Sequence, residues 1–180
     1  MILLLLLACL PIGALGASTN DVEVRVLLST GGADSLSLTV TGAYSVNGVS
    51  FTGGTLTASL DGSAVSVKHS SKGTLQSAAS VRIVRSTAAY GDAYLHFSNS
   101  KHGERDYLGD MVLVNDGGTL RLINYVGLRE YLYGAVSGEL SDSSHAELLK
   151  TQTIIAKGFA YAEVLARTSK LYDVYDTTTS

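Results

Sequence analysis

Apolar and polar residues alternate along the N-terminal part of the chain. Every second residue from Val22 to Leu28 is apolar, and the same spacing recurs from Leu36 to Val40. A period of two is typical of a strand with one face buried and the other in water. The pattern continues, less regularly, to about Tyr125, so it predicts a strand-rich N-terminal region.

Three short turn signals separate the predicted strands: Asn47-Gly48, Asp61-Gly62 and Asp116-Gly117-Gly118. The first two suit type I′ hairpin turns, which require a positive φ at both central residues. Connections this short cannot carry a crossover between parallel strands. The turns therefore predict antiparallel pairing.

The stretch from Gly73 to Asn99 has a less clear period. Strands are predicted at Ser80–Arg85 and Ala93–Ser98, where apolar residues alternate with polar ones. The run Asn99–Asp106 is polar and predicts a loop.

The period becomes helical after Asn124. Leu128–Tyr133 predicts a short helix that is weakened by the glycines and the serine that follow it. Ser144 and Glu147 have the spacing of a capping box, in which the Ser144 hydroxyl accepts from the Glu147 backbone N–H. A second helix is therefore predicted from there to about residues 169–170.

One stripe of the second predicted helix is apolar or small, and it consists of Leu149, Thr153, Ala156, Ala160 and Val164. Such a stripe predicts close packing against a sheet or another helix. Tyr172–Asp176 predicts a further extended segment. The order of elements predicts an α+β fold, with an antiparallel β-rich N-terminal part followed by a helical segment.

Composition narrows the class of protein. The chain has 180 residues, of which 46% are hydrophobic and 16% charged, and its net charge is -3. These values predict a globular domain, taken as residues 22–180, with a sizeable core. A basic stripe is absent, which disfavours nucleic-acid binding by simple electrostatics.

The N-terminal sequence MILLLLLACLPIGALGAS predicts an export signal over residues 1–17. The apolar run is too short to span a bilayer, and its leucines disfavour the alternative of a buried strand. Cys9 is the one cysteine, which excludes a disulfide within the chain. Leu6-Leu7-Ala8-Cys9 resembles a lipobox, so Cys9 is either a lipid anchor or part of the removed signal. The protein is thus predicted to be extracytoplasmic.

Glu139 is the candidate catalytic residue. It stands in Ser137-Gly138-Glu139-Leu140, which predicts a turn between the two helices. A lone acid at such a place is either a general acid/base or a solvated loop residue. Val136, Leu140 and Tyr133 are candidates for the apolar walls that a general acid requires.

Lys150 and Gln152 lie near the start of the second predicted helix, where they either orient a substrate or remain exposed. His69, His96 and His102 have no ligand spacing, so no metal site is predicted.

The C-terminal part resembles a known family. Leu128–Gly134 is similar to the motif L-E-x-Y-L-x-G of the stage II sporulation protein D / LytB (amidase enhancer) family, which leads into V-V-P-x-E-M. The acid of that motif corresponds to Glu139. Leu148–Ala160 resembles A-L-K-A-Q-A-V-A-A-R-T-Y-A, with Lys157 in place of the arginine. Tyr172–Ser180 resembles Y-D-x-x-D-T-T.

The resemblance implies an exported protein that acts on peptidoglycan. Members of the sporulation type are lytic transglycosylases that cut denuded glycan beside a partner amidase/endopeptidase, and LytB-type members enhance a cell-wall amidase. It implies Glu139 as catalytic acid and no cofactor. The substrate-binding residues that it implies are Lys150, Gln152, Lys157 and Tyr133. Members usually continue for many more residues, which in some of them supply zinc ligands, so the domain is expected to be incomplete at its C-terminus.

Overall fold

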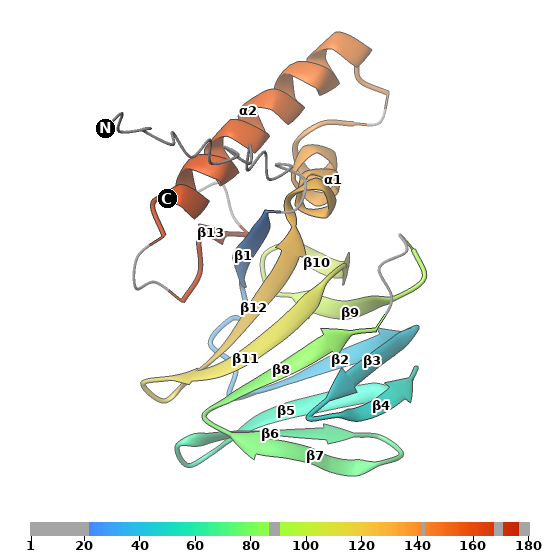
Figure 1. Ribbon diagram of the computed structural model, residues 1–180, viewed down its shortest axis with the longest axis vertical. Coiled ribbons are helices and arrows are strands. Elements are labelled where there is room, and N and C mark those ends of the chain that lie inside the picture. The colour runs from blue at the N-terminus through green and yellow to red at the C-terminus, as the bar shows by residue number, and fades with distance from the viewer. Residues whose placement is uncertain (1–21, 87–90, 142, 168–170, 177–180) are drawn as a thin grey trace, which may run out of the picture.

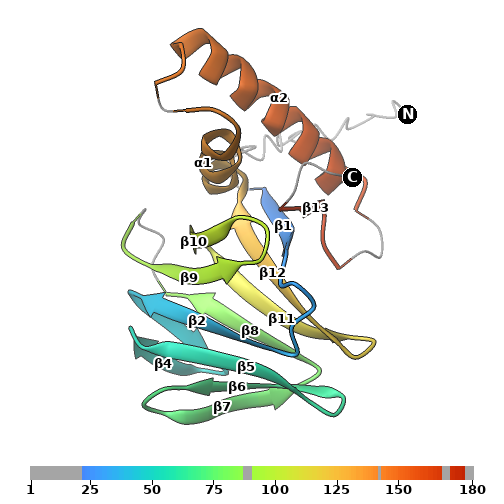
Figure 2. The same cartoon turned by 180° about the vertical axis from the view of Figure 1, so that it is seen from behind.

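The computed structural model describes residues 22–86, 91–141, 143–167 and 171–176. These residues form two β-sheets and two α-helices, and both helices lie at one end of the sheets (Figures 1 and 2). The predicted signal peptide, Cys9 and residues 177–180 lie outside the described ranges.

Two sheets hold the strands of the described residues. The first has the order β13 (Val174–Tyr175), β1 (Glu23–Leu28), β12 (Thr119–Gly127), β11 (Asp110–Asp116), β8 (Ser80–Arg85), β3 (Ala43–Val46) and β4 (Val49–Thr52). The second has the order β10 (Gly103–Tyr107), β9 (Tyr94–Asn99), β2 (Ser35–Thr41), β5 (Thr55–Asp61), β6 (Ala64–His69) and β7 (Gly73–Ala78). The helices α1 (Leu128–Glu139) and α2 (Ala146–Leu165) follow β12.

The hydrophobic core lies between the sheets. Leu38 and Leu56 of the six-stranded sheet belong to one buried cluster with Ile83, Leu113 and Leu122 of the seven-stranded sheet. Burial alternates along β2 as the sequence predicts. The prediction of an α+β fold, antiparallel and β-rich before its helices, is confirmed.

The outer face of the seven-stranded sheet is also partly covered. Leu27 is buried between the alternating core residues of β1, in a second cluster with Val112 and Ile123 against which Tyr172 packs. The segment 171–176 contains β13, which pairs with β1 in parallel. The other strand pairs of the described residues are antiparallel.

The predicted turns are right in place, but one is wrong in type. Asn47 and Gly48 both have positive φ, at 48° and 76°, as a type I′ turn requires. Asp61 instead pairs with Ala64 as the last residue of β5. Of the two loop residues left, Gly62 has a φ of 60°, which suits the first central position of a type II′ turn.

The loop predicted at 99–106 is wrong. Gly103–Tyr107 forms β10, which pairs with β9 at the edge of its sheet. The polarity that suggested a loop reflects exposure, because both faces of most of this strand are in water. Charged residues are favoured on such edges, where they discourage pairing with other chains.

The first helix is longer than predicted and continues through Gly134 and Gly138 to Glu139. Tertiary contacts offset the low helix propensity of glycine. Leu128 is buried in the core, and its backbone N–H donates to the carbonyl of Val22 at 2.7 Å. Glu139 therefore ends a helix, whereas the sequence predicted it in a turn.

The predicted capping box at Ser144 is wrong by one residue. His145 is the N-cap of α2, and its Nδ1 accepts from the backbone N–H of Glu147 at 3.3 Å. The Glu147 carboxylate binds Lys150 at 2.9 Å, so the reciprocal bond of a capping box is replaced by an ion pair. The helix ends at Leu165, before the predicted end at 169–170.

Gly134→Ala is expected to stabilise the protein by about 0.5–1 kcal/mol, because alanine has the higher helix propensity. A Cβ at Gly134 would meet no other atom within 4 Å, so no clash opposes the gain. Urea unfolding measures the change.

Gly109→Ala is the matched contrast. Gly109 has a φ of +82°, and a Cβ there would lie 2.3 Å from the carbonyl oxygen of Tyr125. This substitution should destabilise the fold. A loss of stability in Gly134→Ala would contradict the assignment of Gly134 to a freely accessible helix face.

Candidate active site

Glu139 and Gln152 meet where α1 and α2 face each other. Glu139 is exposed at the last residue of α1, and its Oε2 accepts a hydrogen bond from the side-chain amide of Gln152. Its Oε1 has no hydrogen bond to another described residue. Burial raises the pKa of the nearby Tyr131 hydroxyl, and the charge of Glu139 raises it further. The structure thus brings together two of the predicted site residues.

A groove of about 410 Å³ is lined by residues of both helices and by Leu140. Leu140 and Thr153 follow Glu139 and Gln152 in sequence, but neither Glu139 nor Gln152 lines the groove itself. Its lining is mostly apolar, and Tyr133, whose exposed fraction is 47%, contributes an aromatic ring. Val136 and Leu140, the predicted apolar walls, also line it. The described residues that line the groove are Arg129, Leu132, Tyr133, Val136, Ser137, Leu140, Leu149 and Thr153. None of them is acidic.

The two lysines lie apart from the acid. The ammonium of Lys150 is exposed and paired with Glu147, so it does not bind Glu139. Lys157 is half-buried on α2 and makes no hydrogen bond or ion pair with another described residue. Of the predicted substrate-binding residues, Gln152 therefore contacts the acid and Tyr133 lines the groove.

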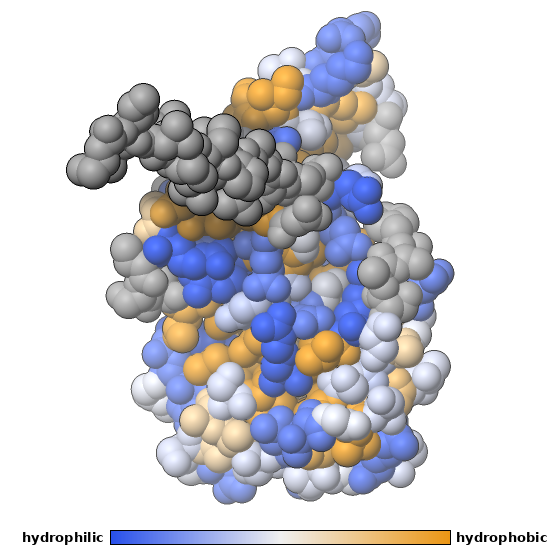
Figure 3. Space-filling view, in the orientation of Figure 1, coloured by the Kyte–Doolittle hydropathy of each residue, from blue (hydrophilic) through white to orange (hydrophobic). Residues whose placement is uncertain are grey.

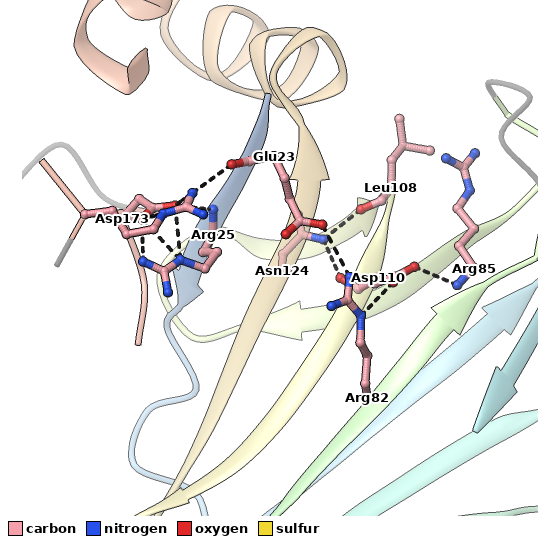
Figure 4. A network of polar contacts seen from close by, with 9 residues as sticks. Glu23, Arg25, Arg82, Arg85, Leu108, Asp110, Asn124 and Asp173 are labelled. Carbon is pink, nitrogen blue, oxygen red and sulfur yellow. Dashed lines mark hydrogen bonds and ion pairs between the residues drawn. The ribbon is translucent and has the colours of Figure 1, made fainter. Parts of the chain in front are cut away.

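The start of α1 is tied to the seven-stranded sheet. Glu130 accepts from Arg85 of β8 at 3.0 Å, and the Arg85 side chain is only 5% exposed. Asp110 in turn accepts from the Arg85 backbone N–H and from Arg82, both at 2.8 Å (Figure 4). The Asn124 amide donates to the carbonyls of Leu108, at 2.7 Å, and Asp110, at 3.1 Å.

The end of α2 is tied to β1 through Asp173. This carboxylate is fully buried and accepts from Arg25 at 2.7 Å (Figure 4). It also accepts from Arg167, just after α2, at 2.5 Å. It also accepts from the backbone N–H of Arg25 at 2.8 Å. Burial acts to raise the pKa of Asp173, but the hydrogen bonds from Arg25 and Arg167 outweigh it and hold the pKa below its ordinary value.

The second acid of the same motif, Asp176, reaches both sheets. It accepts from the backbone N–H and the hydroxyl of Ser29, at 2.6 and 2.7 Å, just beyond β1. It also accepts from Asn99 of β9 at 2.6 Å. Sequence reasoning noticed the motif but missed these structural roles, because the partners lie far away in the chain.

The outer side of α2 exposes large apolar residues: Leu148, Ile154, Ile155, Phe159 and Leu165. Figure 3 shows hydrophobic surface in this helical layer. Among the helices that the structure describes, none is long and apolar enough to cross a membrane. The described His, Cys, Asp and Glu residues form no group of three or more that is placed to hold a metal ion.

The C-terminal part of the chain matches a known protein family. The SpoIID family model, described as stage II sporulation protein, matches residues 116–180. The resemblance to SpoIID is confirmed. This SpoIID segment, residues 116–180, spans β12, α1, α2 and β13 and includes Glu139, Gln152, Asp173 and Asp176. SpoIID is a family related to sporulation and the cell wall. No curated protein and no solved structure matches the chain.

Asp173→Asn should lower the free energy of unfolding by about 2–3 kcal/mol at neutral pH, because hydrogen bonds to a charged group in a buried site are lost. Urea unfolding measures this. Asp116→Asn is the control, since Asp116 pairs with Arg121 on the surface, where an ion pair contributes at most about 1 kcal/mol.

The stability difference between wild type and Asp173→Asn should depend on pH. The pKa of Asp173 is lower in the folded than in the unfolded protein. Its contribution to the free energy of unfolding is therefore complete above the unfolded-state pKa of about 3.9 and is lost as the pH falls through the folded-state pKa. The stability difference between wild type and Asp173→Asn should therefore shrink below about pH 4. A difference that grows toward low pH would contradict the ion-pair assignment.

Proposed function

We propose that this protein is an exported peptidoglycan lytic transglycosylase that cuts denuded glycan strands, with Glu139 as general acid/base. The observation that carries the proposal is the pair at the helix junction. Gln152 donates to one oxygen of Glu139, and the other oxygen has no described partner. The residues that follow the pair in sequence, Leu140 and Thr153, line an open groove. The SpoIID match supports the cell-wall context.

A single acid is sufficient for this reaction. Glycoside hydrolases normally use two carboxylates, one as acid and one as base or nucleophile. In a lytic transglycosylase Glu139 first donates its proton to the glycosidic oxygen as the bond from that oxygen to the anomeric carbon breaks. The Glu139 carboxylate then takes the proton of the muramic-acid C6 hydroxyl, whose oxygen attacks the same carbon and closes the anhydro ring. Water is not consumed.

The neighbouring residues have distinct roles in this proposal. The neutral amide of Gln152 orients the carboxylate without competing for its proton. The exposed ring of Tyr133 packs on a sugar face in the groove, since tyrosine combines an apolar ring with a polar tip. Lys150 and Lys157 lie on either side of Gln152 along the sequence of α2, where they orient the strand or stabilise developing charge. The chemistry requires no cofactor.

A second candidate function is a non-catalytic module that recruits or enhances a cell-wall amidase/endopeptidase. The observation that favours it is the exposure of Glu139, since a general acid is commonly set in partly apolar surroundings. Under this alternative the wall is bound but not cut, and Glu139 is a surface residue.

Glu139→Gln separates the two functions. Incubation with denuded, peptide-free glycan, followed by mass spectrometry, should yield anhydromuramyl ends with the wild type. The variant should yield them at a rate lower by about 10²-fold or more, because the proton donor is lost. Glu104→Gln, an exposed acid on the edge strand β10, is the matched control and should cut like the wild type.

Two results would reject the catalytic proposal. Equal yields from Glu139→Gln and wild type would remove Glu139 from the chemistry. A wild-type chain that stimulates an amidase on intact sacculi but gives no anhydromuramyl ends would favour the recruiting module.

A further inference from the structure

A second hollow lies on the outer face of the seven-stranded sheet. Its volume is about 130 Å³, and it is lined by residues of β1, the β11–β12 hairpin and the segment around β13. It shares no lining residue with the groove between the helices. The mechanism proposed above does not use it.

One wall of the hollow is aromatic. Tyr172 and Tyr175 lie with their ring centroids 4.7 Å apart and their planes tilted by 58°. Their hydroxyls share a hydrogen bond, which fixes the two rings against each other. Tyr175 is 51% exposed, so a ring surface is presented to solvent. Leu27 and Ile123, both buried, provide an apolar floor.

Two further lining residues of the hollow, Arg121 and Asp116, carry opposite charges. Arg121 Nε donates to Asp116 Oδ2 at 3.3 Å, and the two side chains are 41% and 48% exposed. The guanidinium has further N–H donors and the carboxylate further acceptor positions, so both can bind a ligand without breaking their pair. The neighbouring carboxylate repels an anion, which disfavours a phosphate ligand.

We propose that this hollow is a saccharide subsite that takes an N-acetylated sugar unit of a glycan strand. The C–H face of a pyranose ring packs on the exposed ring of Tyr175. Its hydroxyls bind Arg121 and Asp116, and the acetamido methyl group contacts the apolar floor. Concave sites that combine an apolar surface with a few convergent polar groups are typical of small-ligand binding, but such pockets usually measure about 300–1,000 Å³. At about 130 Å³ the hollow receives one face and the acetamido group of the sugar rather than enclosing the whole unit.

The subsite deepens the proposed function and rests on it, because a glycan strand is the ligand in both. It holds a strand on the sheet, separately from the groove beside Glu139. The two sites are therefore separable by mutation. Loss of the hollow should weaken strand binding and raise KM, and it should leave the cleavage step unchanged.

The test uses the full chain with Glu139→Gln, so that bound glycan is not cut. The ¹⁵N-labelled protein is titrated with the tetramer of N-acetylglucosamine and, as comparison, with cellotetraose, which lacks the acetamido groups. Amide shifts should cluster at 116, 121, 172 and 175, and cellotetraose should bind more weakly.

Tyr175→Ala in the same background should weaken binding of the acetylated tetramer at least about tenfold, which corresponds to roughly 1.4 kcal/mol. Arg121→Ala should weaken it as well. Arg82→Ala is the matched control, because Arg82 has a similar exposure of 45% on the same sheet but does not line the hollow. Thermal unfolding verifies that each variant is folded.

The subsite is rejected if the tetramer shifts only residues around the helix groove, if it shifts none, or if Tyr175→Ala binds like the parent. Unchanged binding by Tyr175→Ala together with cleavage by the wild type would reject the subsite and keep the catalytic proposal. Binding at the hollow without cleavage would keep the subsite and reject the catalytic proposal.

Discussion

The buried carboxylate of Asp173 is the interaction on which the architecture depends. Removing a charge from water costs several kcal/mol, and a buried ion is tolerated only where its geometry is well satisfied. Asp173 meets this condition because two guanidinium groups and a backbone N–H converge on it. Arg25 belongs to β1 and Arg167 follows α2, so the ion pair joins the first strand of the sheet to the end of the last helix.

The two helices are anchored at opposite ends. An ion pair between Glu130 and Arg85 holds the start of α1, and an ion pair between Arg167 and Asp173 holds the end of α2. Glu139 is the last residue of α1 and Gln152 lies in the N-terminal half of α2, where the two helices contact each other. The helix junction is held by contacts between the two helices, including the hydrogen bond from Gln152 to Glu139, and a glycan strand in the groove would contact both helices at once.

Much of the fold could be predicted because periodicity and turn chemistry are local. Alternation identified β1, β2, β8 and β9, and Asn47-Gly48 identified a hairpin. The misses have physical causes. β10 is charged because it is an edge strand, and α1 continues through its glycines because tertiary contacts hold it. Single-sequence patterns contain neither edge position nor tertiary support.

The candidate site could be predicted only in part. Motif spacing pointed to Glu139 and Gln152, and the structure joins them. The family resemblance implied Lys150 as a substrate-binding residue, whereas in the structure an ion pair with Glu147 one helical turn away occupies its ammonium group. The structural roles of Asp173 and Asp176 could not be predicted, because their partners Arg25, Ser29 and Asn99 are remote in sequence.

The placement of β1 has a consequence for the order of folding. Val26 pairs with Asn124 on one side and with Val174 on the other, so both neighbours of the first strand come late in the chain. Contacts between such distant residues require closure of long loops and slow the search for the native state. In the six-stranded sheet, β5, β6 and β7 pair through consecutive hairpins and require no such closure, whereas Thr39 of β2 pairs with the distant His96 of β9. During synthesis, the β5–β6–β7 meander can therefore form early. The strand β1 can pair only after the SpoIID segment, which contains β12 and β13, has been synthesised.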